Sequence, residues 1–423
     1  MPSPRPCPRR STRPWSKPLV LHEFEKLPGL VKDHVHCDIV AAPYPDRLQD
    51  VLPTSLMHEA QQEIAQWHGY EPTPLHSLVA LAGELDLSAI YYKDEGLRFG
   101  LGSFKALGGA FAVIKQLQEV IESRTGNRVS MESIRKGEHA DLCGQITVAS
   151  ATAGNHGRSL AWGAQRAGCP CKIYIHAGVG DARKEAMEAF GAEVIRVAGD
   201  YDASVYHAAA EADKNGWFIV SDTSYPGYLE RPRDIMAGYT VMVREVLDAL
   251  EPDNLPTHVF LQTGCGGLAA GFAGGLWLET GADLPRIVVV EPTEAPCLLL
   301  SARNHAATAY QIEVESMMVG LSCGEVSILA WDILEPCSSD YITITDDGIP
   351  PAMRLLASGA PGGIPIVGGE SGVAGLAALI DAARRQDLRT GLGLSENSRV
   401  LLIGSEGATS PDIYQEIVGH AAA

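Results

Sequence analysis

A single lysine, Lys105, stands among glycine and apolar residues in the stretch LRFGLGSFKALGGA, residues 97 to 110. Lysine is seldom buried in such surroundings unless another group pairs with it. The stretch has the form of a glycine-rich turn that leads into a helix, and it places an amine at the mouth of that helix. The alternative is a lysine that merely extends from the helix face into solvent.

A second glycine turn, SATAGNHGRSL at residues 150 to 160, follows an expected strand and opens an expected helix. The N-terminus of a helix directs unpaired backbone amides at whatever lies in front of it. Asn155 adds a side-chain donor to this turn, and His156 adds a second polar group. The alternative interpretation is an ordinary strand-to-helix loop with capping residues.

A third turn, QTGCGGLAAG at residues 262 to 271, lies between the strand-like HVFLQ and another expected helix. Its glycines remove side chains, so that the backbone can wrap an anion. The turn contains no lysine or arginine. Any phosphate bound here is therefore held by backbone amides and by the helix dipole.

The third turn also permits a nicotinamide-binding interpretation. Gly264, Gly266 and Ala269 satisfy the pattern G-x-G-x-x-A, and Glu291 ends the strand that follows. However, the pattern lies far along the chain instead of in a first strand–helix–strand unit. A dehydrogenase would also leave Lys105 and the GNHG turn without a role.

Pyridoxal phosphate accounts for all three features together. This cofactor needs a lysine for its aldehyde, a cradle of amides for its one phosphate, and a donor near its phenolic oxygen. The motifs GSFKALGG, AGNHG, QTGCGGLAAG and GGESGVAG resemble those of the tryptophan-synthase-like (fold type II) pyridoxal phosphate enzymes. The stretches DEGLRFG, SDTSYPGYLERPRDIMAGY and VGLSCGE narrow the resemblance to the diaminopropionate ammonia-lyase family, over roughly residues 35 to 418.

The resemblance implies a role for each residue of the cofactor site. Lys105 would form the Schiff base and serve as base or proton shuttle, and Asn155 would hydrogen-bond the phenolic oxygen. Ser405, in LLIGSEGAT, would meet the pyridine nitrogen, although a helix cap is the plainer interpretation. The residues that would cradle the phosphate are Gly264, Cys265, Gly266, Gly267 and Leu268.

The resemblance also implies how a substrate would be handled. Asp222, in SDTSY, matches a family aspartate that manages substrate protons and the departing amine. The backbone turn that would bind the substrate carboxylate consists of Thr152, Ala153, Gly154 and His156. No metal site is implied.

Two positions depart from the family pattern. Ala153 stands where the family has a second aspartate, directly before GNHG, and Gly102 stands where the family can carry asparagine. The resemblance implies reaction with both stereoisomers of the substrate, for which we expect one acid–base group on each face of the cofactor. The loss of one carboxylate therefore predicts a strong preference for one isomer, the L-isomer. Cys323, in LSCGE, is expected to be a buried small residue rather than a wall of the active site.

The implied reaction is an α,β-elimination on a small amino acid, namely 2,3-diaminopropionate to pyruvate and ammonia. A serine/threonine or 3-hydroxyaspartate dehydratase on the same scaffold is the nearest alternative, and a β-replacement synthase is a third.

Buried strands and amphipathic helices alternate along the chain from about residue 145. The strand-like runs are QITVAS, CKIYIHA, EVIRVAG, WFIVSD, HVFLQT, RIVVVEP and RVLLIGS. This pattern predicts an α/β fold of two doubly wound open sheets, with ligands at the carboxyl ends of the strands. The expected division is a basic, disordered tail at 1–20, a large cofactor-binding domain at 21–109 and 236–423, and a small mobile domain at 110–235.

Composition limits the remaining possibilities. The 423 residues carry a formal net charge of −19, which disfavours a nucleic-acid partner, and there is no run of 18 apolar residues that would span a membrane. The nine cysteines are scattered without metal-binding spacing, as expected of reduced thiols in a cytoplasmic protein. The expected partner is a small amino acid substrate, and the family resemblance implies a homodimer.

Overall fold

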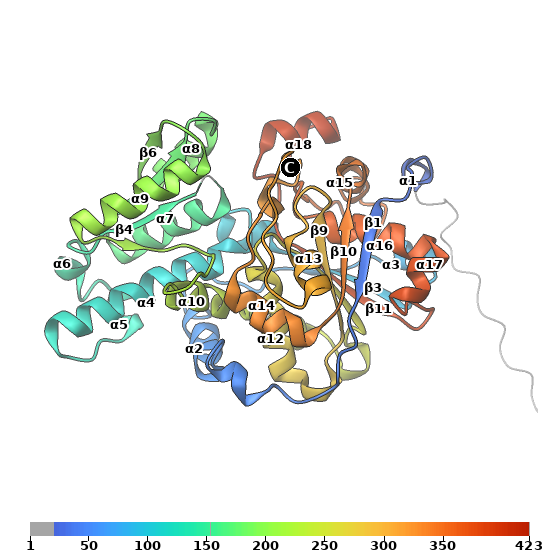
Figure 1. Ribbon diagram of the computed structural model, residues 1–423, viewed down its shortest axis with the longest axis horizontal. Helices are drawn as coiled ribbons and strands as arrows, with labels where there is room; N and C mark the ends of the chain where they lie inside the picture. Colours follow the sequence, from blue (N-terminus) through green and yellow to red (C-terminus); the bar gives the residue numbers. More distant parts are fainter. Residues whose placement is uncertain (1–20, 153, 423) are drawn as a thin grey trace, which may run out of the picture.

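The computed structural model describes residues 21–152 and 154–422. The chain forms two open sheets with helices between and around them (Figure 1). The strands are β1 (Val31–His36), β2 (Leu75–Ser77), β3 (Ala89–Asp94), β4 (Val148–Ala151), β5 (Cys171–His176), β6 (Glu193–Val197), β7 (Phe218–Ile219), β8 (His258–Gln262), β9 (Arg286–Pro292), β10 (Ser338–Ile344) and β11 (Arg399–Gly404).

The helices alternate with these strands. The α-helices are α1 (His22–Glu25), α2 (Thr54–Ile64), α3 (Val79–Glu84), α4 (Lys105–Thr125), α5 (Met131–Arg135), α6 (Ala140–Cys143), α7 (Asn155–Ala167), α8 (Asp181–Glu188), α9 (Tyr201–Asn215), α10 (Glu230–Tyr239), α11 (Val241–Ala249), α12 (Gly267–Thr280), α13 (Cys297–Asn304), α14 (Ile328–Cys337), α15 (Ile349–Ala357), α16 (Ala374–Arg384), α17 (Gln386–Gly391) and α18 (Pro411–Val418). Short 3₁₀ segments join several of them, including η2 (Glu95–Gly100) directly before α4.

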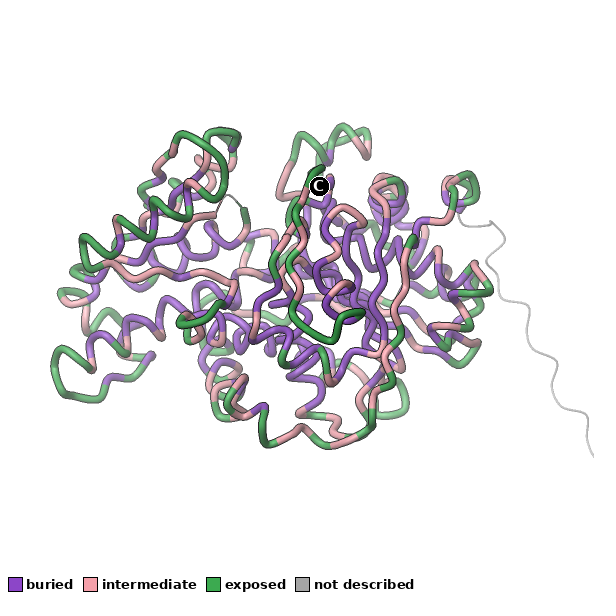
Figure 2. The backbone as a smooth tube through the Cα atoms, viewed as in Figure 1, coloured by how far each residue is buried: buried purple, intermediate pink, exposed green. Residues whose placement is uncertain are grey.

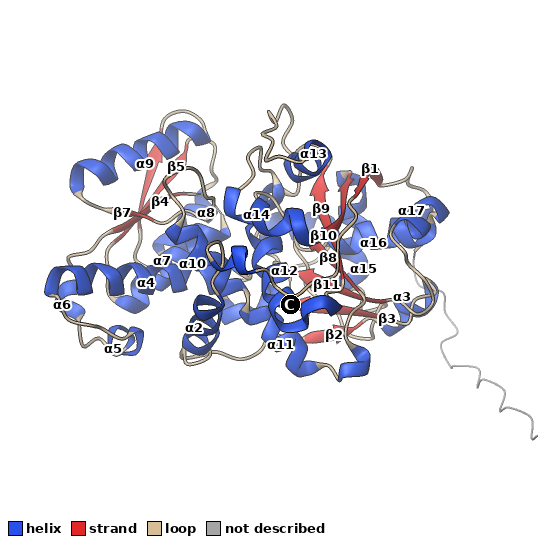
Figure 3. Ribbon diagram, turned by 60° about the horizontal axis from the view of Figure 1, so that its bottom comes forward, coloured by secondary structure: helices blue, strands red, loops and turns tan. Residues whose placement is uncertain are grey.

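The smaller sheet has the strand order β6-β5-β4-β7, and all its neighbours are parallel. The larger sheet has the order β1-β10-β9-β8-β11-β3-β2. Its five central strands are parallel, and the two edge strands, β1 and β2, run antiparallel to their neighbours. Figure 3 shows the two sheets well separated, with helices such as α7, α10 and α12 in the region between them. The predicted α/β class with open sheets is confirmed, whereas the predicted domain boundaries and the mobility of the smaller domain stay predictions.

Alternate residues of the larger sheet point into two different cores. On β8, Val259 and Leu261 belong to the core shared with α4, α10 and α12, whereas Phe260 belongs to the core under α15 and α16. On β11, Leu401 and Leu402 divide in the same way. Because side chains alternate along a strand, a strand covered on both faces reads as a continuous apolar run. The tube in Figure 2 is accordingly buried along most of the central strands of this sheet.

The strands of the apolar runs lie where the sequence predicts them, but four strands have no such signal. The edge strands β1 and β2 are polar, and β3 and β10 carry charged residues that are nevertheless buried, including Lys93 and Asp340. Burial of these charges is possible because each meets an opposite charge, Glu245 for Lys93 and Arg286 for Asp340. Such pairing joins residues far apart in the chain and leaves no local pattern.

Candidate active site

Lys105 is the first residue of α4, as the glycine-rich stretch predicts. The loop before it bends through three residues with positive φ, namely Phe99 (52°), Gly100 (69°) and Gly102 (81°). Glycine adopts this region without steric cost, which explains two of the three residues. The Lys105 side chain is 21% exposed. The amine therefore lies at an opening and not in the core.

Asp222 follows β7 and meets Lys105 across the gap between the two sheets. Its Oδ2 accepts a hydrogen bond from Lys105 Nζ at 2.5 Å, although the two residues are 117 positions apart. Burial disfavours both charges, but their mutual attraction outweighs it. The pKa of Lys105 is therefore raised and the pKa of Asp222 is lowered from their ordinary values. At neutral pH the pair is an ammonium and a carboxylate, so the amine must lose a proton before it can act as a nucleophile.

His156, the second residue of α7, completes this cluster and is 4% exposed. Its Nε2 lies 2.9 Å from the carbonyl oxygen of Val220, so Nε2 carries the ring proton. Its Nδ1 has no hydrogen-bond partner and lies 4.0 Å from Asp222 Oδ2. The cluster of Lys105, Asp222 and His156 thus retains one unpaired buried nitrogen beside the ion pair.

Asn155, the first residue of α7, is held by a carboxylate that the sequence interpretation missed. Its Nδ2 donates to Glu406 Oε2 at 2.6 Å, and the Ser371 amide donates to Glu406 Oε1 at 3.0 Å. Burial, helped by the charge of Glu370, raises the pKa of Glu406. Because an amide nitrogen carries two protons, the second N–H of Asn155 remains free for another acceptor. The signal in the sequence was the glutamate that directly follows Ser405 in GSEGAT.

The third glycine turn joins β8 to α12 and lies against the same cluster. Gly266 has φ of 103°, and a Cβ atom there would come within 2.8 Å of the Ala330 Cβ. A Cβ on Gly264 would lie 3.2 Å from the Cys323 Cβ, whereas one on Gly267 would meet only the Asp222 carbonyl oxygen at 3.6 Å. The turn therefore requires glycine at Gly266, while the protein alone leaves room for a side-chain atom at Gly267. Leu268, in the first turn of α12, is buried.

Cys265 links this turn to Asp222, since its Sγ lies 3.9 Å from the Asp222 carbonyl oxygen. A hydrogen bond from Cys323 lowers the pKa of Cys265 to about 6, against the opposing effect of burial. Cys323 is half-buried, which corrects the sequence interpretation of a buried small residue. Its thiol donates a hydrogen bond to the Glu325 carbonyl oxygen at 3.1 Å.

Ser405 follows β11 and is 3% exposed. Its Oγ accepts a hydrogen bond from Gln262 Nε2 at 3.2 Å, and its carbonyl oxygen accepts from the Phe104 amide at 3.1 Å. The hydroxyl proton is left for another acceptor, such as a ring nitrogen. The backbone contact fixes Ser405 beside the loop that carries Lys105.

The turn before α7 offers fewer amides than the sequence suggests. The Thr152 amide donates to the Tyr174 carbonyl oxygen at 3.1 Å and is therefore occupied. Gly154 is exposed with extended backbone, and the amides that follow it begin α7. The predicted contribution of Ala153 lies outside the described residues.

Tyr239, at the end of α10, is a further member of the site that the sequence interpretation missed. Its ring packs edge-on against Phe104, with 4.7 Å between ring centroids, and its hydroxyl is buried without a hydrogen-bond partner. Burial raises the pKa of Tyr239, and the nearby Lys105 charge opposes that shift. The orphaned hydroxyl thus faces the Lys105 amine. Only the docking of α10 on α4 could reveal this contact.

These groups fit pyridoxal phosphate. The glycine turn, in which Gly266 has positive φ and no room for a Cβ atom beside Ala330, presents backbone amides at the start of a helix of 14 residues. Lys105, the free N–H of Asn155 and the hydroxyl proton of Ser405 are available around it. They supply the amine, the donor and the ring contact that the cofactor needs.

Residues 21–152 and 154–422 contain no group of three or more histidine, cysteine, aspartate or glutamate side chains that could hold a metal ion. Within these residues, no helix combines the length and the apolar character needed to cross a membrane.

Comparison with known proteins agrees with this assignment. Residues 67–406 match the family model described as pyridoxal-phosphate dependent enzyme. Diaminopropionate ammonia-lyase from Salmonella typhimurium is 37% identical over 379 residues, which cover 87% of this chain and 93% of that protein. The enzyme of the same name from Escherichia coli K12 is 35% identical, over 86% of this chain and 92% of its own length.

A solved structure shows the same arrangement of the chain. The crystal structure of diaminopropionate ammonia lyase from Escherichia coli, in complex with an aminoacrylate-PLP azomethine reaction intermediate, superposes with a TM-score of 0.81. The two sequences are 32% identical, and the match covers 92% of this chain and 98% of the other.

Proposed function

The chain belongs to the pyridoxal-phosphate dependent enzymes and, among them, to the diaminopropionate ammonia-lyase family, and from this premise we propose that it converts 2,3-diaminopropionate to pyruvate and ammonia. The observation that carries the proposal is the Lys105–Asp222 ion pair at an opening lined by the glycine turn of residues 264–268. Elimination of an amine requires a base for the α-proton and an acid for the leaving group. The ion pair can supply both.

When bound, pyridoxal phosphate withdraws electrons from the substrate and so makes its α-proton acidic. Lys105 would hold the cofactor aldehyde, and the turn of Gly264, Cys265, Gly266, Gly267 and Leu268 would hold the phosphate. Asn155 would donate its free N–H to the phenolic oxygen. Ser405 would donate to the ring nitrogen without forcing that nitrogen to be protonated, and this limits the electron withdrawal and so favours elimination over transamination.

The two members of the ion pair have different proton roles. Because the pKa of Asp222 is lowered, its carboxylate remains ionised at neutral pH and cannot itself donate a proton. It stabilises the ammonium form of Lys105, which can protonate the departing amine. In its neutral form the Lys105 amine takes the α-proton. His156 Nδ1, unpaired beside Asp222, accepts a hydrogen bond from substrate or water.

The substrate carboxylate binds at the start of α7, through the amides that follow Thr152. Ala153 carries no carboxylate, and the Glu406 carboxylate is already held by Asn155 and by the Ser371 amide, so Lys105 and Asp222 are the groups that exchange protons with the substrate. We therefore expect the L-isomer to react faster than the D-isomer.

A substrate panel tests the proposal. Release of 2-oxo acid is measured with L- and D-diaminopropionate, serine, threonine and the 3-hydroxyaspartates. The proposal expects L-diaminopropionate to have the highest kcat/KM, and it expects the D-isomer to be about 10²–10⁴-fold slower, the usual cost of a missing acid or base. Ala153→Asp should restore part of the D-activity, and Ala151→Asp, two residues earlier in the same segment, serves as the control. Equal rates on both isomers would contradict the one-sided arrangement.

The same panel examines a dehydratase, the second candidate. The dehydratase reaction differs from the proposed one only in the leaving group. Both leaving groups need a proton as they depart, one as water and the other as ammonia. Fast turnover of a β-hydroxy amino acid with no reaction of either diaminopropionate isomer would replace the proposed function with the dehydratase.

We also propose a homodimer in the cytoplasm. Eight free cysteines among the described residues support a reducing compartment. Light scattering of the purified holoenzyme distinguishes the dimer from a monomer of 45.1 kDa.

A further inference from the structure

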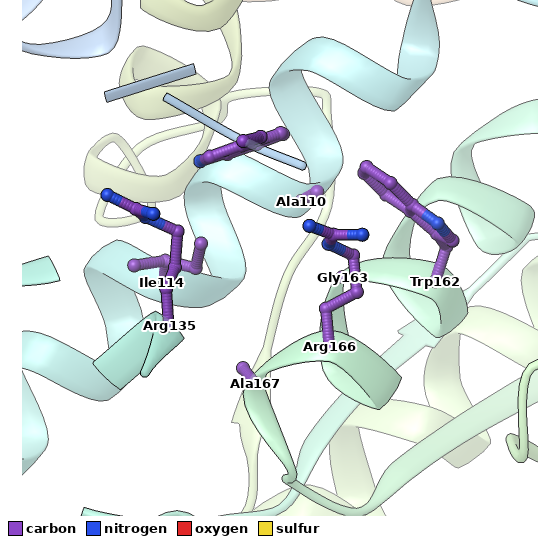
Figure 4. A pocket seen from close by; sticks show the side chains of 8 residues that line it. Ala110, Ile114, Arg135, Trp162, Gly163, Arg166 and Ala167 are labelled. Carbon is purple, nitrogen blue, oxygen red and sulfur yellow. The ribbon is translucent and has the colours of Figure 1, made fainter. Parts of the chain in front are cut away.

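A cavity of about 220 Å³ lies between α4 and α7, on a different part of these helices from Lys105 and Asn155. Ala110 and Ile114 of α4 form one wall, and Trp162 and Arg166 of α7 form another (Figure 4). Trp67, from the segment after α2, and Arg135, at the end of α5, complete it. Neither the Lys105–Asp222 pair nor the phosphate turn contributes to it.

The walls are flat and apolar. Trp67 and Trp162 are 4% and 8% exposed, and their ring centroids lie 5.8 Å apart. Small residues cover the floor between them, where the helices approach so closely that a Cβ on Gly163 would lie 2.6 Å from the Ala110 Cα. A cavity of this size and shape suits a small planar molecule, since apolar walls with few polar groups are typical of ligand sites.

The two arginines at the cavity differ in their charge balance. Arg135 pairs with the Glu63 carboxylate, so its charge is compensated. Arg166 has no carboxylate partner within residues 21–152 and 154–422, and its guanidinium carbon lies 4.9 Å above the Trp162 ring. Burial and the charge of Arg135 lower the pKa of Arg166. Arg166 is an exposed residue that lines the cavity, and its uncompensated guanidinium, stacked on Trp162, is a binding group for one carboxylate.

We propose that this cavity binds a small aromatic monocarboxylate, with its ring against Trp67 and Trp162 and its carboxylate on Arg166, and that the bound ligand alters the loop that carries Lys105. The proposal does not depend on the identity of the substrate.

The coupling follows from the aromatic contacts of Phe99. Its ring lies 5.8 Å from the Trp67 ring and 4.9 Å from the Trp162 ring, so it packs on both aromatic walls. Phe99 has φ of 52°, an uncommon conformation for a bulky residue, and it stands six positions before Lys105 in the chain. A ligand that moves either tryptophan therefore acts on the most constrained point of the lysine loop.

Calorimetric titration of the holoenzyme with phenylacetate and with phenylacetamide, its neutral analogue, tests the binding. Phenylacetate should bind saturably at one site and about tenfold more tightly than the amide, the ratio expected of one charge-assisted contact. Arg166→Gln should remove this difference, and Ala167→Met should block both probes by filling the cavity. Arg124→Gln, which removes an exposed arginine from the end of α4, is the matched control. No saturable binding, equal binding of acid and amide, or equal loss in the Arg124→Gln variant would overturn the site.

Cofactor binding tests the coupling. The Kd of pyridoxal phosphate for the apoprotein, followed by absorbance, should change at least about fivefold at saturating phenylacetate in the wild type, the lower end of ordinary coupling energies. It should not change in Arg166→Gln. An unchanged Kd in the wild type would contradict the coupling. An equal change of the Kd in Arg166→Gln would also contradict it, because the probe would then act at the active site itself.

Discussion

Two clusters of charge, one on each side of the loop between β3 and α4, differ in burial and in the number of their hydrogen-bond partners. The Lys105 cluster consists of Lys105, Asp222 and His156, and its side chains keep between 5% and 23% of their exposure. The second cluster, here called the buried network, consists of Lys93, Glu95, Arg98 and Glu245, with side chains no more than 3% exposed.

The buried network is saturated with partners. Arg98 donates to both oxygens of Glu95 and to both oxygens of Glu245, and Lys93 donates to Glu245 and to the Thr73 carbonyl oxygen. Burial opposes the Arg98 charge, yet the two carboxylates raise its pKa. The Lys105 cluster, in contrast, has one ion pair, an unpaired His156 nitrogen and access to solvent.

The comparison shows that pairing a charge is not what makes a site reactive. A saturated network fixes the conformation of the segment from β3 to η2, directly before the lysine loop. The unsaturated cluster at the end of that loop keeps groups free for a ligand. Four substitutions test this difference between the two clusters.

Lys105→Ala should have the largest effect. Turnover is expected to fall below detection, because no other described amine lies in the cluster, and the absorbance band of the lysine-bound cofactor should disappear. Circular dichroism should show an unchanged fold. Lys115→Ala, which removes a lysine of the same helix that pairs with Glu59 at the surface, is the control and should retain activity. Residual activity and an intact band in Lys105→Ala would place the cofactor lysine elsewhere.

Asp222→Asn should reduce kcat by about 10²–10⁴-fold, the usual cost of a lost general acid, because Lys105 loses the carboxylate that stabilises its proton-donating form. The Lys105 amine would then be subject to burial without its counterion, so its pKa should fall below the ordinary value of about 10.4. The variant apoprotein should therefore react with pyridoxal phosphate at lower pH than the wild type. An unshifted pH profile of this reaction would disprove the electrostatic role of Asp222.

The same substitution has a pH signature in stability. Because the pKa of Asp222 is lowered on folding, its contribution to stability is full above its unfolded pKa of about 3.9 and is lost as the pH falls through the lower folded value. The raised pKa of Lys105 has the opposite sign, so its contribution is full below about 10.4 and is lost at higher pH. The stability difference between wild type and Asp222→Asn should thus be greatest between these limits, as measured by urea unfolding.

Glu245→Gln should act on stability instead of chemistry. It leaves Arg98 and Lys93 buried with one carboxylate fewer, and breaking a buried ion pair typically costs about 3–5 kcal/mol of unfolding free energy. The kcat per folded molecule should change much less than in Asp222→Asn. Glu132→Gln, at the exposed pair with Lys136, is the control and should leave the free energy of unfolding nearly unchanged. A kcat loss as large as that of Asp222→Asn would show that the buried network takes part in the reaction.

Tyr239→Phe should have the smallest effect on the fold. Its hydroxyl is buried without a partner, so its removal should leave the free energy of unfolding of the apoprotein equal or up to about 1 kcal/mol higher. If the hydroxyl contacts the Lys105 amine during the reaction, the pH dependence of kcat should shift. Destabilisation of the apoprotein by more than that amount would mean that the hydroxyl has a partner in solution.

Much of the site could be predicted from the sequence, because turns and helix starts depend on neighbouring residues. The start of α4 at Lys105 follows from a glycine-rich turn before an apolar helix, and the turn between β8 and α12 follows from glycines between a buried strand and a helix. Continuous apolar runs predicted strands such as β8, β9 and β11, because strands covered on both faces need such runs. The strands β1, β2, β3 and β10 were not predicted, because their polar and charged residues, which pair with distant parts of the chain, interrupt the apolar pattern.

The sequence by itself determined which backbone segments can wrap an anion, where the amine stands and which strands are buried, because backbone conformation and side-chain periodicity are properties of neighbouring residues. Only the tertiary structure decided which groups meet. The contact of Asp222 with Lys105 depends on the position of β7 in the smaller sheet, that of Glu406 with Asn155 on the end of β11, and that of Tyr239 with Phe104 on the packing of α10 against α4. These contacts join residues that are far apart in the chain, and the packing of the two sheets and their helices is what brings them together.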